Sequence, residues 1–374
     1  MHILFAGGGT AGHINPALAI AAHFKQMHPD AKISFIGTPN RLEARLVPQA
    51  GYDFYTIEVD GFQRSLSLQN IKRNLSAAYK AVKSSSDAKK LLRKLQPDVV
   101  VGTGGYVSGP VLREAAKLGI KTAIHEQNAY PGVTNKMLAN KVDRVMLAMP
   151  EAKERLGMKG EPVITGNPVR ESVMHADKAA ARAALGMDDR PMILSFGGSL
   201  GARIINETAA DVLAWHWQSG KYYHYHGAGK AGYESMKALL AQKKVDLENA
   251  PTVRFSEYIN DMDLCMAAAD LVICRAGAIT LSELQAQGKA SILIPSPYVA
   301  ENHQYHNAMT LKKMGAAEVF EEKDLTGEKL VAAVKNLLEN PEQLREMGVR
   351  AKASAITDVH DRIYNVIMQL FESR

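Results

Sequence analysis

Two glycine-rich turns, one near the start of each half of the chain, constrain the fold most strongly. The first lies within Phe5–His13 and reads FAGGGTAGH, and the second lies within Ser195–Ala202 and reads SFGGSLGA. Each turn follows a short apolar run and precedes a helix-like pattern. A helix N-terminus has unpaired amides and a favourable dipole for phosphate, and glycine lets the phosphate approach the backbone. We therefore expect two α/β domains with anion-binding turns.

Strand-like and helix-like patterns alternate along the rest of the chain. Such alternation predicts doubly wound parallel sheets, in which ligands bind at the carboxyl ends of the strands. Helical patterns between the strands include residues 16–27 and 111–118. The apolar runs that we assign to strands are 3–6, 33–36, 99–101, 122–125 and 144–147 in the first half, and 192–196, 222–226, 253–255, 271–273 and 291–294 in the second.

The composition fits a chain of this class. With 374 residues and 46% hydrophobic content, the sequence is long enough for two domains with separate cores. The two cysteines, Cys265 and Cys274, have no metal-binding or paired spacing, which indicates a reduced, cytosolic setting. The start of the chain has no basic leader, and no apolar segment approaches the ~18 residues of a spanning helix. We expect no integral membrane segment.

Positive charge is concentrated between Phe62 and Gln96. This stretch holds nine Lys or Arg and a single acid, Asp87, whereas the formal net charge of the whole chain is +6. Apolar residues recur between the charges, so the stretch suits an anionic lipid surface. The alternative is an ordinary amphipathic helix that packs on a core. No nucleic-acid motif accompanies the charge, and we expect no nucleic-acid partner.

The first glycine turn does not fit a standard nucleotide cofactor. Gly7, Gly9 and Gly12 have the G-x-G-x-x-G spacing of dinucleotide-binding turns. However, the second strand ends Phe35-Ile36-Gly37-Thr38, without the acidic residue that holds a ribose, and neither turn continues into Gly-Lys-Ser/Thr. The turns therefore predict a phosphate site that is neither an NAD site nor a P-loop, and we expect no cofactor.

A third turn follows the strand at 271–273. Thr280 and Glu283 have the spacing of a capping box, which predicts that a helix starts at Thr280 and that Glu283 caps it. The alternative is that the amides of residues 278–280 bind a diphosphate while Glu283 accepts hydrogen bonds from a ribose. The polar residues at 301–307 are well placed to bind sugar hydroxyls.

One D-x-D pair, Asp261 and Asp263, has a spacing that a metal-dependent sugar transferase would use. A helical pattern begins at the same place and continues through residues 264–269. Acidic side chains are favoured in the first turn of a helix, and we therefore interpret the pair as first-turn acids rather than metal ligands.

Six segments in order resemble the motifs of the MurG family, which uses UDP-N-acetylglucosamine to convert lipid I to lipid II in peptidoglycan synthesis. They are GGGTAGH (7–13), HEQN (125–128), TGNPVR (165–170), GGSLGA (197–202), RAGAIT (275–280) and QYHNA (304–308). The resemblance implies the GT-B fold, with two Rossmann-like domains facing a cleft. Residues 1–165, joined by 355–374, would form the acceptor-binding and membrane-facing domain, and residues 166–354 the UDP-sugar domain.

The resemblance also implies roles for individual residues. Asn128 would contact the donor, Arg170 the diphosphate, Ile259 the uracil through its backbone, and Gln304 the sugar hydroxyls. The remaining substrate-binding residues are Thr10, Ala11 and Gly12 in the first turn, Ser199 in the second, and Ala278, Ile279, Thr280, Leu281, Ser282 and Glu283 in the third. The family commonly has Gly-Gly before the histidine, where this chain has Ala11-Gly12, so Ala11 requires a negative φ.

The implied reaction is a single displacement with inversion, in which an acceptor hydroxyl attacks the anomeric carbon and UDP leaves. Such a step needs a base and a positive potential at the leaving group. We predict His13 as the base, because imidazole titrates near neutral pH; the alternative is that it only binds phosphate. Glu126 is the second candidate, with a structural role as its alternative. Arg170 and helix amides would stabilise the leaving group, so no metal is expected.

The expected partners follow from the same resemblance. They are UDP-N-acetylglucosamine, lipid I, an anionic membrane surface contacted through residues 62–96, and other cell-wall synthesis proteins. The enzyme would be peripheral, at the cytoplasmic face of the cell membrane. Two alternatives remain open at this point: a UDP-N-acetylglucosamine epimerase of the same fold, which needs no acceptor, and a regulatory protein that binds nucleotide without turnover.

Overall fold

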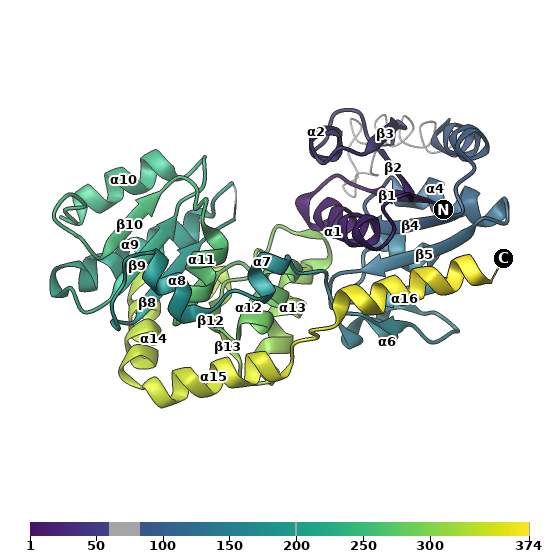
Figure 1. The fold of residues 1–374 in the computed structure, drawn as a ribbon. Coiled ribbons are helices and arrows are strands. Elements are labelled where there is room, and N and C mark those ends of the chain that lie inside the picture. Colours follow the sequence, from purple (N-terminus) through teal and green to yellow (C-terminus); the bar gives the residue numbers. More distant parts are fainter. Residues whose placement is uncertain (60–82, 199, 374) are drawn as a thin grey trace. The chain divides into compact units, whose positions relative to one another are not determined.

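The computed structural model describes residues 1–59, 83–198 and 200–373, and the chain divides into two compact units. Unit 1 consists of Met1–Pro168 and Asp358–Arg374, and unit 2 consists of Val169–Thr357. Each unit has one parallel sheet with helices between the strands (Figure 1). None of the described helices is both long and apolar enough to cross a membrane.

In the described part of unit 1, the sheet has seven strands in the order β3-β2-β1-β4-β5-β6-β7, and neighbouring strands pair in parallel. Its central strands are buried on both faces, which explains their continuous apolar runs. The strands are β1 (His2–Gly7), β2 (Lys32–Gly37), β3 (Asp53–Thr56), β4 (Val99–Gly104), β5 (Lys121–Glu126), β6 (Arg144–Leu147) and β7 (Val163–Ile164).

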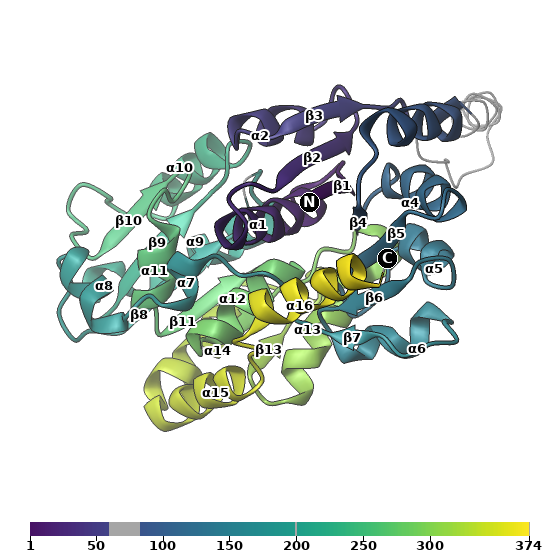
Figure 2. The same ribbon diagram turned by 45° about the vertical axis from the view of Figure 1, so that its right-hand side comes forward.

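The two faces of this sheet are covered by different helices. Leu4 and Ala6 of β1 pack into a core with Val111 and Leu112 of α4 (Ser108–Lys117). The last helix, α16 (Val359–Glu372), returns to unit 1 and packs on α1 (Ala11–Met27), β4 and β5 (Figure 2). The other described helices of unit 1 are residues 83–95, α2 (Glu43–Gln49), α5 (Val133–Leu138) and α6 (Lys153–Leu156).

The sheet of unit 2 has six strands in the order β10-β9-β8-β11-β12-β13, again paired in parallel. Ile193 and Ile273 pack with Val334 of α14 and Met347 of α15 in the main core of this unit. The strands are β8 (Met192–Phe196), β9 (Tyr223–Gly227), β10 (Val253–Ser256), β11 (Leu271–Cys274), β12 (Ala290–Leu293) and β13 (Ala317–Val319). The helices are α7 (Glu171–Met174), α8 (Lys178–Ala184), α9 (Arg203–His216), α10 (Tyr233–Gln242), α11 (Met262–Ala268), α12 (Ala278–Gln287), α13 (His303–Lys313), α14 (Gly327–Glu339) and α15 (Pro341–Ala353).

All ten strands expected from the apolar runs are present, and the expected fold class is confirmed. Among the residues that the structure describes, there are three additional strands, β3, β7 and β13, and each lies at the edge of its sheet. Edge strands have one paired side and less burial, so their sequences carry a weaker apolar signal.

Candidate active site

The first glycine turn connects β1 to α1. Thr10 is the N-cap of α1, with an extended backbone and no capping hydrogen bond from its side chain. Ala11 is the first residue of the helix and is not among the described residues with positive φ, so its methyl group is compatible with the turn. Thr10, Ala11 and Gly12 are exposed, and the first turn of α1 contains no acidic residue. The turn therefore presents a positive helix end to an anionic or hydroxyl ligand.

The side chain of Glu43, at the start of α2, is hydrogen-bonded to this turn. One carboxylate oxygen accepts a hydrogen bond from the amide of Gly9 at 2.9 Å, and the other accepts from the amide and hydroxyl of Thr38 at 3.0 and 2.6 Å. The side chain is 0% exposed. Burial alone would raise the pKa of Glu43, but the hydrogen bonds from Thr38 and Gly9 outweigh it and lower the pKa. Sequence reasoning missed Glu43, because it lies 34 residues from Gly9.

The turn after β4 packs directly on the first glycine turn. A Cβ on Gly105 would lie 2.3 Å from the carbonyl oxygen of Gly8, so this contact requires a glycine. The hydroxyl of Thr103 donates to the carbonyl of His13 at 2.8 Å. The pair Gly104-Gly105 directly after an apolar strand is the sequence signal for this turn, and both glycines have positive φ.

His13 lies where these two turns meet, in the first turn of α1, and is half-buried. Its Nδ1 is 3.1 Å from the carbonyl oxygen of Thr103 and 3.2 Å from Oε1 of Gln127. The Gln127 amide is oriented by its Nε2, which donates to the carbonyl of His125 at 2.9 Å. Because both partners of Nδ1 are acceptors, Nδ1 carries the proton in the neutral ring and Nε2 carries the lone pair. His13 is therefore in the tautomer that a base needs at Nε2.

Glu126, at the end of β5, has a different environment. One oxygen accepts from the backbone and side-chain amides of Asn128, at 2.9 and 3.1 Å. The other accepts from the amide of Gly132 at 3.0 Å and from Asn135 at 2.8 Å. The carboxylate is 1% exposed and both oxygens are fully engaged. This geometry favours the structural alternative, in which Glu126 fixes the loop that carries Asn128.

In unit 2, the second glycine turn connects β8 to α9. Gly201 has φ +83, and a Cβ there would lie 2.2 Å from the carbonyl oxygen of Ala228, so the turn packs tightly on the end of β9. Asn206 of α9 donates to the same carbonyl at 2.9 Å. Ser199, an expected phosphate ligand, lies outside the described residues. Ile259 is buried in the connection after β10, and its side chain packs near Gly227.

The third turn corrects the capping-box expectation. The helix α12 begins at Ala278, with Gly277 as an extended N-cap that makes no side-chain capping bond, so Thr280 is the third residue of the helix. The amides of Ile279 and Thr280 lie in the first turn, which is the geometry of the diphosphate-binding alternative. Leu281 is fully buried, and Ser282 donates to the carbonyl of Ala278 at 3.2 Å.

Glu283 pairs with Arg170 instead of capping its own helix. The two side chains are joined by an ion pair of 3.2 Å between Oε1 and Nη2. Glu283 is only 9% exposed, and burial raises its pKa, partly offset by Arg170. Arg170 is itself the N-cap of α7 and is exposed. The pair thus places a guanidinium close to the N-terminal turns of α12.

Gln304 lies in the first turn of α13, after β12. Its Oε1 accepts a hydrogen bond from the amide of Ser296 at 2.9 Å, which orients the side-chain amide. Glu301 and Asn302, directly before this helix, both have positive φ, of 55° and 49°. Two adjacent non-glycine residues in this region are strained, and such strain is concentrated at functional segments.

In unit 2, these segments gather at one end of the sheet. Apart from Arg170, the expected donor residues of unit 2 that the structure describes follow β10, β11 and β12. They therefore belong to the carboxyl ends of parallel strands, where α/β sheets bind ligands. Asp261 pairs with Arg254 at 2.8 Å, and Asp263 lies in the first turn of α11, as expected for helix-start acids. Among the described residues, no group of three or more His, Cys, Asp or Glu has a metal-binding arrangement.

Comparison with known proteins gives a consistent result. The N-terminal domain model of glycosyltransferase family 28 matches residues 3–147, and the C-terminal domain model of that family matches residues 192–363. The chain is 44% identical over 375 residues to the UDP-N-acetylglucosamine–N-acetylmuramyl-(pentapeptide) pyrophosphoryl-undecaprenol N-acetylglucosamine transferase of Acetivibrio thermocellus, covering 100% of this chain and 99% of that protein. It is 41% identical to the protein of the same name from Bacillus cytotoxicus, with full coverage of both.

Solved structures agree with the sequence relatives. The crystal structure of Acinetobacter baumannii MurG superimposes with a TM-score of 0.79 at 31% identity, covering 98% of this chain and 99% of that one. A UDP-GlcNAc 2-epimerase from Neisseria meningitidis superimposes with a TM-score of 0.68, covering 99% of this chain and 100% of that one, but at 12% identity. The epimerase therefore shares the fold alone.

Proposed function

The chain belongs to the family of UDP-N-acetylglucosamine–N-acetylmuramyl-(pentapeptide) pyrophosphoryl-undecaprenol N-acetylglucosamine transferases, and from this membership we propose its reaction. It transfers N-acetylglucosamine from UDP-N-acetylglucosamine to the 4-hydroxyl of the muramyl sugar in lipid I, and the product is lipid II. The observation that carries the proposal is 44% identity to a relative of that name over the full length of both chains. The proposal is tested by incubating the protein with both substrates and measuring the mass of the lipid product by mass spectrometry. The mass should increase by one N-acetylhexosamine residue.

His13 is the base of the proposed reaction. The acceptor hydroxyl attacks the anomeric carbon, its proton passes to Nε2 of His13, and the bond between that carbon and the diphosphate oxygen breaks as UDP leaves. The support for this role is the hydrogen bonding of Nδ1 to Thr103 and Gln127, which leaves the lone pair on Nε2. The four hydrogen bonds of Glu126 argue for a positioning role for that residue.

Unit 2 supplies the groups that hold the donor. Arg170 and the first-turn amides of α12 stabilise the charge that develops on the departing diphosphate, which is where oriented donors lower a barrier most. Glu283 accepts hydrogen bonds from the ribose and keeps Arg170 in place. The backbone at Ile259 pairs with uracil, Ser199 binds phosphate, and Gln304 binds the sugar hydroxyls. These groups suffice without a metal ion, so activity in EDTA is expected.

The lipid acceptor stays in the bilayer, so the protein works at a membrane surface, and we propose that this is the cytoplasmic face. We assign the contact to the basic stretch 62–96, of which the structure describes residues 83–96. In that part, Ala88 and Leu92 are buried in the core of unit 1, whereas the cations Lys83, Lys89, Lys90, Arg93 and Lys94 are exposed. The described part therefore offers charge rather than an apolar face. Co-sedimentation with liposomes should require anionic lipid, and equal binding to neutral liposomes would contradict the assignment.

A further inference from the structure

A cleft of about 690 Å³ lies at the opposite end of the unit 2 sheet from the expected donor residues. It is lined by Pro191, Asp270 and Lys289, which precede or begin β8, β11 and β12. The remaining wall comes from the segment before α8, the end of α12 and the helix α15. A volume of this size is within the range of small-molecule sites.

The cleft has more cations than acids. Four of its lining residues are Lys178, Lys289, Arg345 and Lys352, and the lining carboxylates are Asp177 and Asp270. Asp177 caps α8 by accepting from the amide of Ala180 at 2.8 Å. A concave surface with an excess of one sign of charge focuses its potential and attracts ions of the opposite sign.

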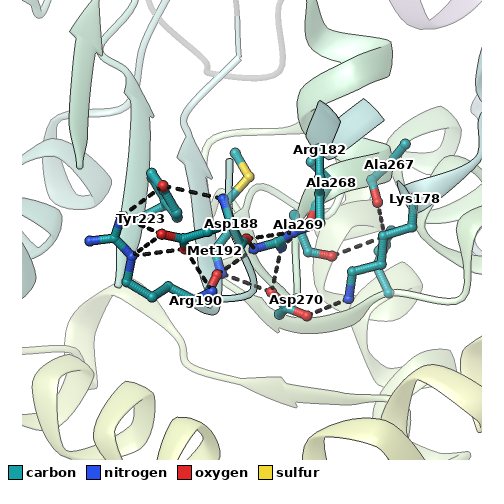
Figure 3. A network of polar contacts seen from close by, with 11 residues as sticks. Lys178, Arg182, Asp188, Arg190, Met192, Tyr223, Ala267, Ala268, Ala269 and Asp270 are labelled. Carbon is teal, nitrogen blue, oxygen red and sulfur yellow. Dashed lines mark hydrogen bonds and ion pairs between the residues drawn. The ribbon is translucent and has the colours of Figure 1, made fainter. Parts of the chain in front are cut away.

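Asp270 cannot balance these cations, because it is shared. Figure 3 shows its carboxylate between Lys178, Arg182 and the amide of Met192. Arg182 lies 3.3 Å from one oxygen, the amide of Met192 donates to the same oxygen at 2.8 Å, and Lys178 pairs with the other oxygen. Two cations therefore share a single negative charge.

Lys289 is the most deeply placed cation, at 5% exposure. Its ammonium donates to the carbonyls of Ala267 and Ala269, at 2.6 and 2.9 Å, and so caps the end of α11. Lys352 donates in the same way to Ala286, near the end of α12. Hydrogen bonds to these carbonyls explain the positions of the two ammonium groups. A neutral carbonyl group does not, however, cancel their positive charge. Burial is the main cause that lowers the pKa of Lys289, to about 7, and the charge of Lys178 contributes in the same direction.

We propose that this cleft is a second anion-binding site, for a small molecule that carries a phosphate or diphosphate group and an apolar body. Lysine ammonium groups bind phosphate as point charges, and several of them favour a multiply charged anion. The anionic group contacts Lys178, Arg345 and Lys352, which line the cleft. The apolar body lies on Leu338, Leu344 and Val349, which line the same cleft.

The test must separate this site from the donor site, since α12 begins at the donor turn and ends at the cleft. Pyrophosphate and phenyl phosphate are titrated by calorimetry into full-length protein that is saturated with UDP. The wild type should bind one equivalent of either probe. A variant with Arg345→Ala and Lys352→Ala should bind about tenfold more weakly or worse, because two of the cations are lost. The control is Lys335→Ala, an exposed lysine of α14 that pairs with Glu339 and does not line the cleft.

Thermal unfolding without either probe checks that all variants are folded, and UDP affinity should be unchanged in each. The proposal is overturned if the wild type binds neither probe at millimolar concentration. It is also overturned if the double variant binds both probes as tightly as the wild type. Phenyl phosphate that binds no more tightly than inorganic phosphate, in a parallel titration, would refute the apolar part of the site.

Discussion

The carboxylate of Glu43 accepts a hydrogen bond from the amide of Gly9 at 2.9 Å and thereby ties the start of α2 to the first glycine turn. A buried carboxylate that holds a backbone amide fixes the turn in one conformation, because loss of the bond would leave a buried donor unpaired. The turn that precedes His13 is thus positioned by a residue outside the glycine motif.

Replacing Glu43 with alanine should lower both stability and activity. The free energy of unfolding should fall by about 1–3 kcal/mol, since the amides of Gly9 and Thr38 lose their acceptor. Urea unfolding and steady-state kinetics measure the two effects. The Glu43→Gln variant keeps one acceptor oxygen and should lie between wild type and Glu43→Ala; if Glu43→Ala leaves kcat unchanged, the positioning role is wrong.

Glu43 also predicts a pH effect on stability. Its pKa is lower in the folded protein than in the unfolded chain. The unfolded state therefore binds more protons, and the stabilisation is present above the unfolded pKa of 4.5 and lost as pH falls below it. Unfolding in urea at pH 7 and at pH 4 should show a larger loss for the wild type than for Glu43→Gln, and an equal loss would count against this account.

The His13→Ala variant should lose about 10²- to 10⁴-fold in kcat, the usual contribution of a general base. Its affinity for UDP should change little, because the nucleotide groups belong to unit 2. Gln127→Ala should have a smaller effect, since Thr103 still accepts from Nδ1. Single-turnover rates and UDP titration separate the two effects. A His13→Ala enzyme with normal turnover but weak donor binding would support the phosphate-binding alternative instead.

The Glu126→Gln variant tests whether Glu126 is a positioning carboxylate or the base. In Glu126→Gln, the side-chain NH₂ replaces a carboxylate oxygen that had accepted hydrogen bonds from N–H groups, so donor faces donor. The loop that carries Asn128 should therefore become less ordered, and the KM for UDP-N-acetylglucosamine should rise. The kcat should fall much less than in His13→Ala, because His13 is unchanged. A Glu126→Gln variant whose kcat falls as far as that of His13→Ala would identify Glu126 as the base.

Lys289 gives a stability prediction in the alkaline range. Its pKa is about 7 in the folded protein and 10.5 in the unfolded chain. Between these values the unfolded state binds more protons, so this residue makes stability rise with pH. Urea unfolding at pH 7.5 and pH 9.5 should show that rise in the wild type and a smaller one in Lys289→Met. Identical pH dependence in both proteins would contradict the low pKa.

The sequence predicted the interior of both sheets well, because strands buried on both faces are continuous apolar runs. Short edge strands such as β3 and β13 were not predicted, because their half-exposed residues do not form a continuous apolar run. The start of α12 was misplaced by two residues: the spacing of Thr280 and Glu283 is compatible with a capping box, but Gly277 takes the N-cap and Arg170 takes the carboxylate. A pairing over 113 residues leaves no local signal.

Within the candidate site, residues carried by glycine turns were predictable and their supports were not. His13 was found because it follows a glycine motif at a helix start. Glu43 at the start of α2 and Gln127 directly after β5 both contact that turn or His13, and only the folded unit brings them together. The tautomer of His13 likewise depends on two distant acceptors, Thr103 and Gln127.

The most direct test of the proposed function is the release of UDP from UDP-N-acetylglucosamine with a short-chain lipid I analogue, with and without EDTA, beside a control that lacks the acceptor. The account predicts release that requires the acceptor, persists in EDTA and falls sharply in His13→Ala. Turnover of the donor without any acceptor would contradict the account and favour an epimerase.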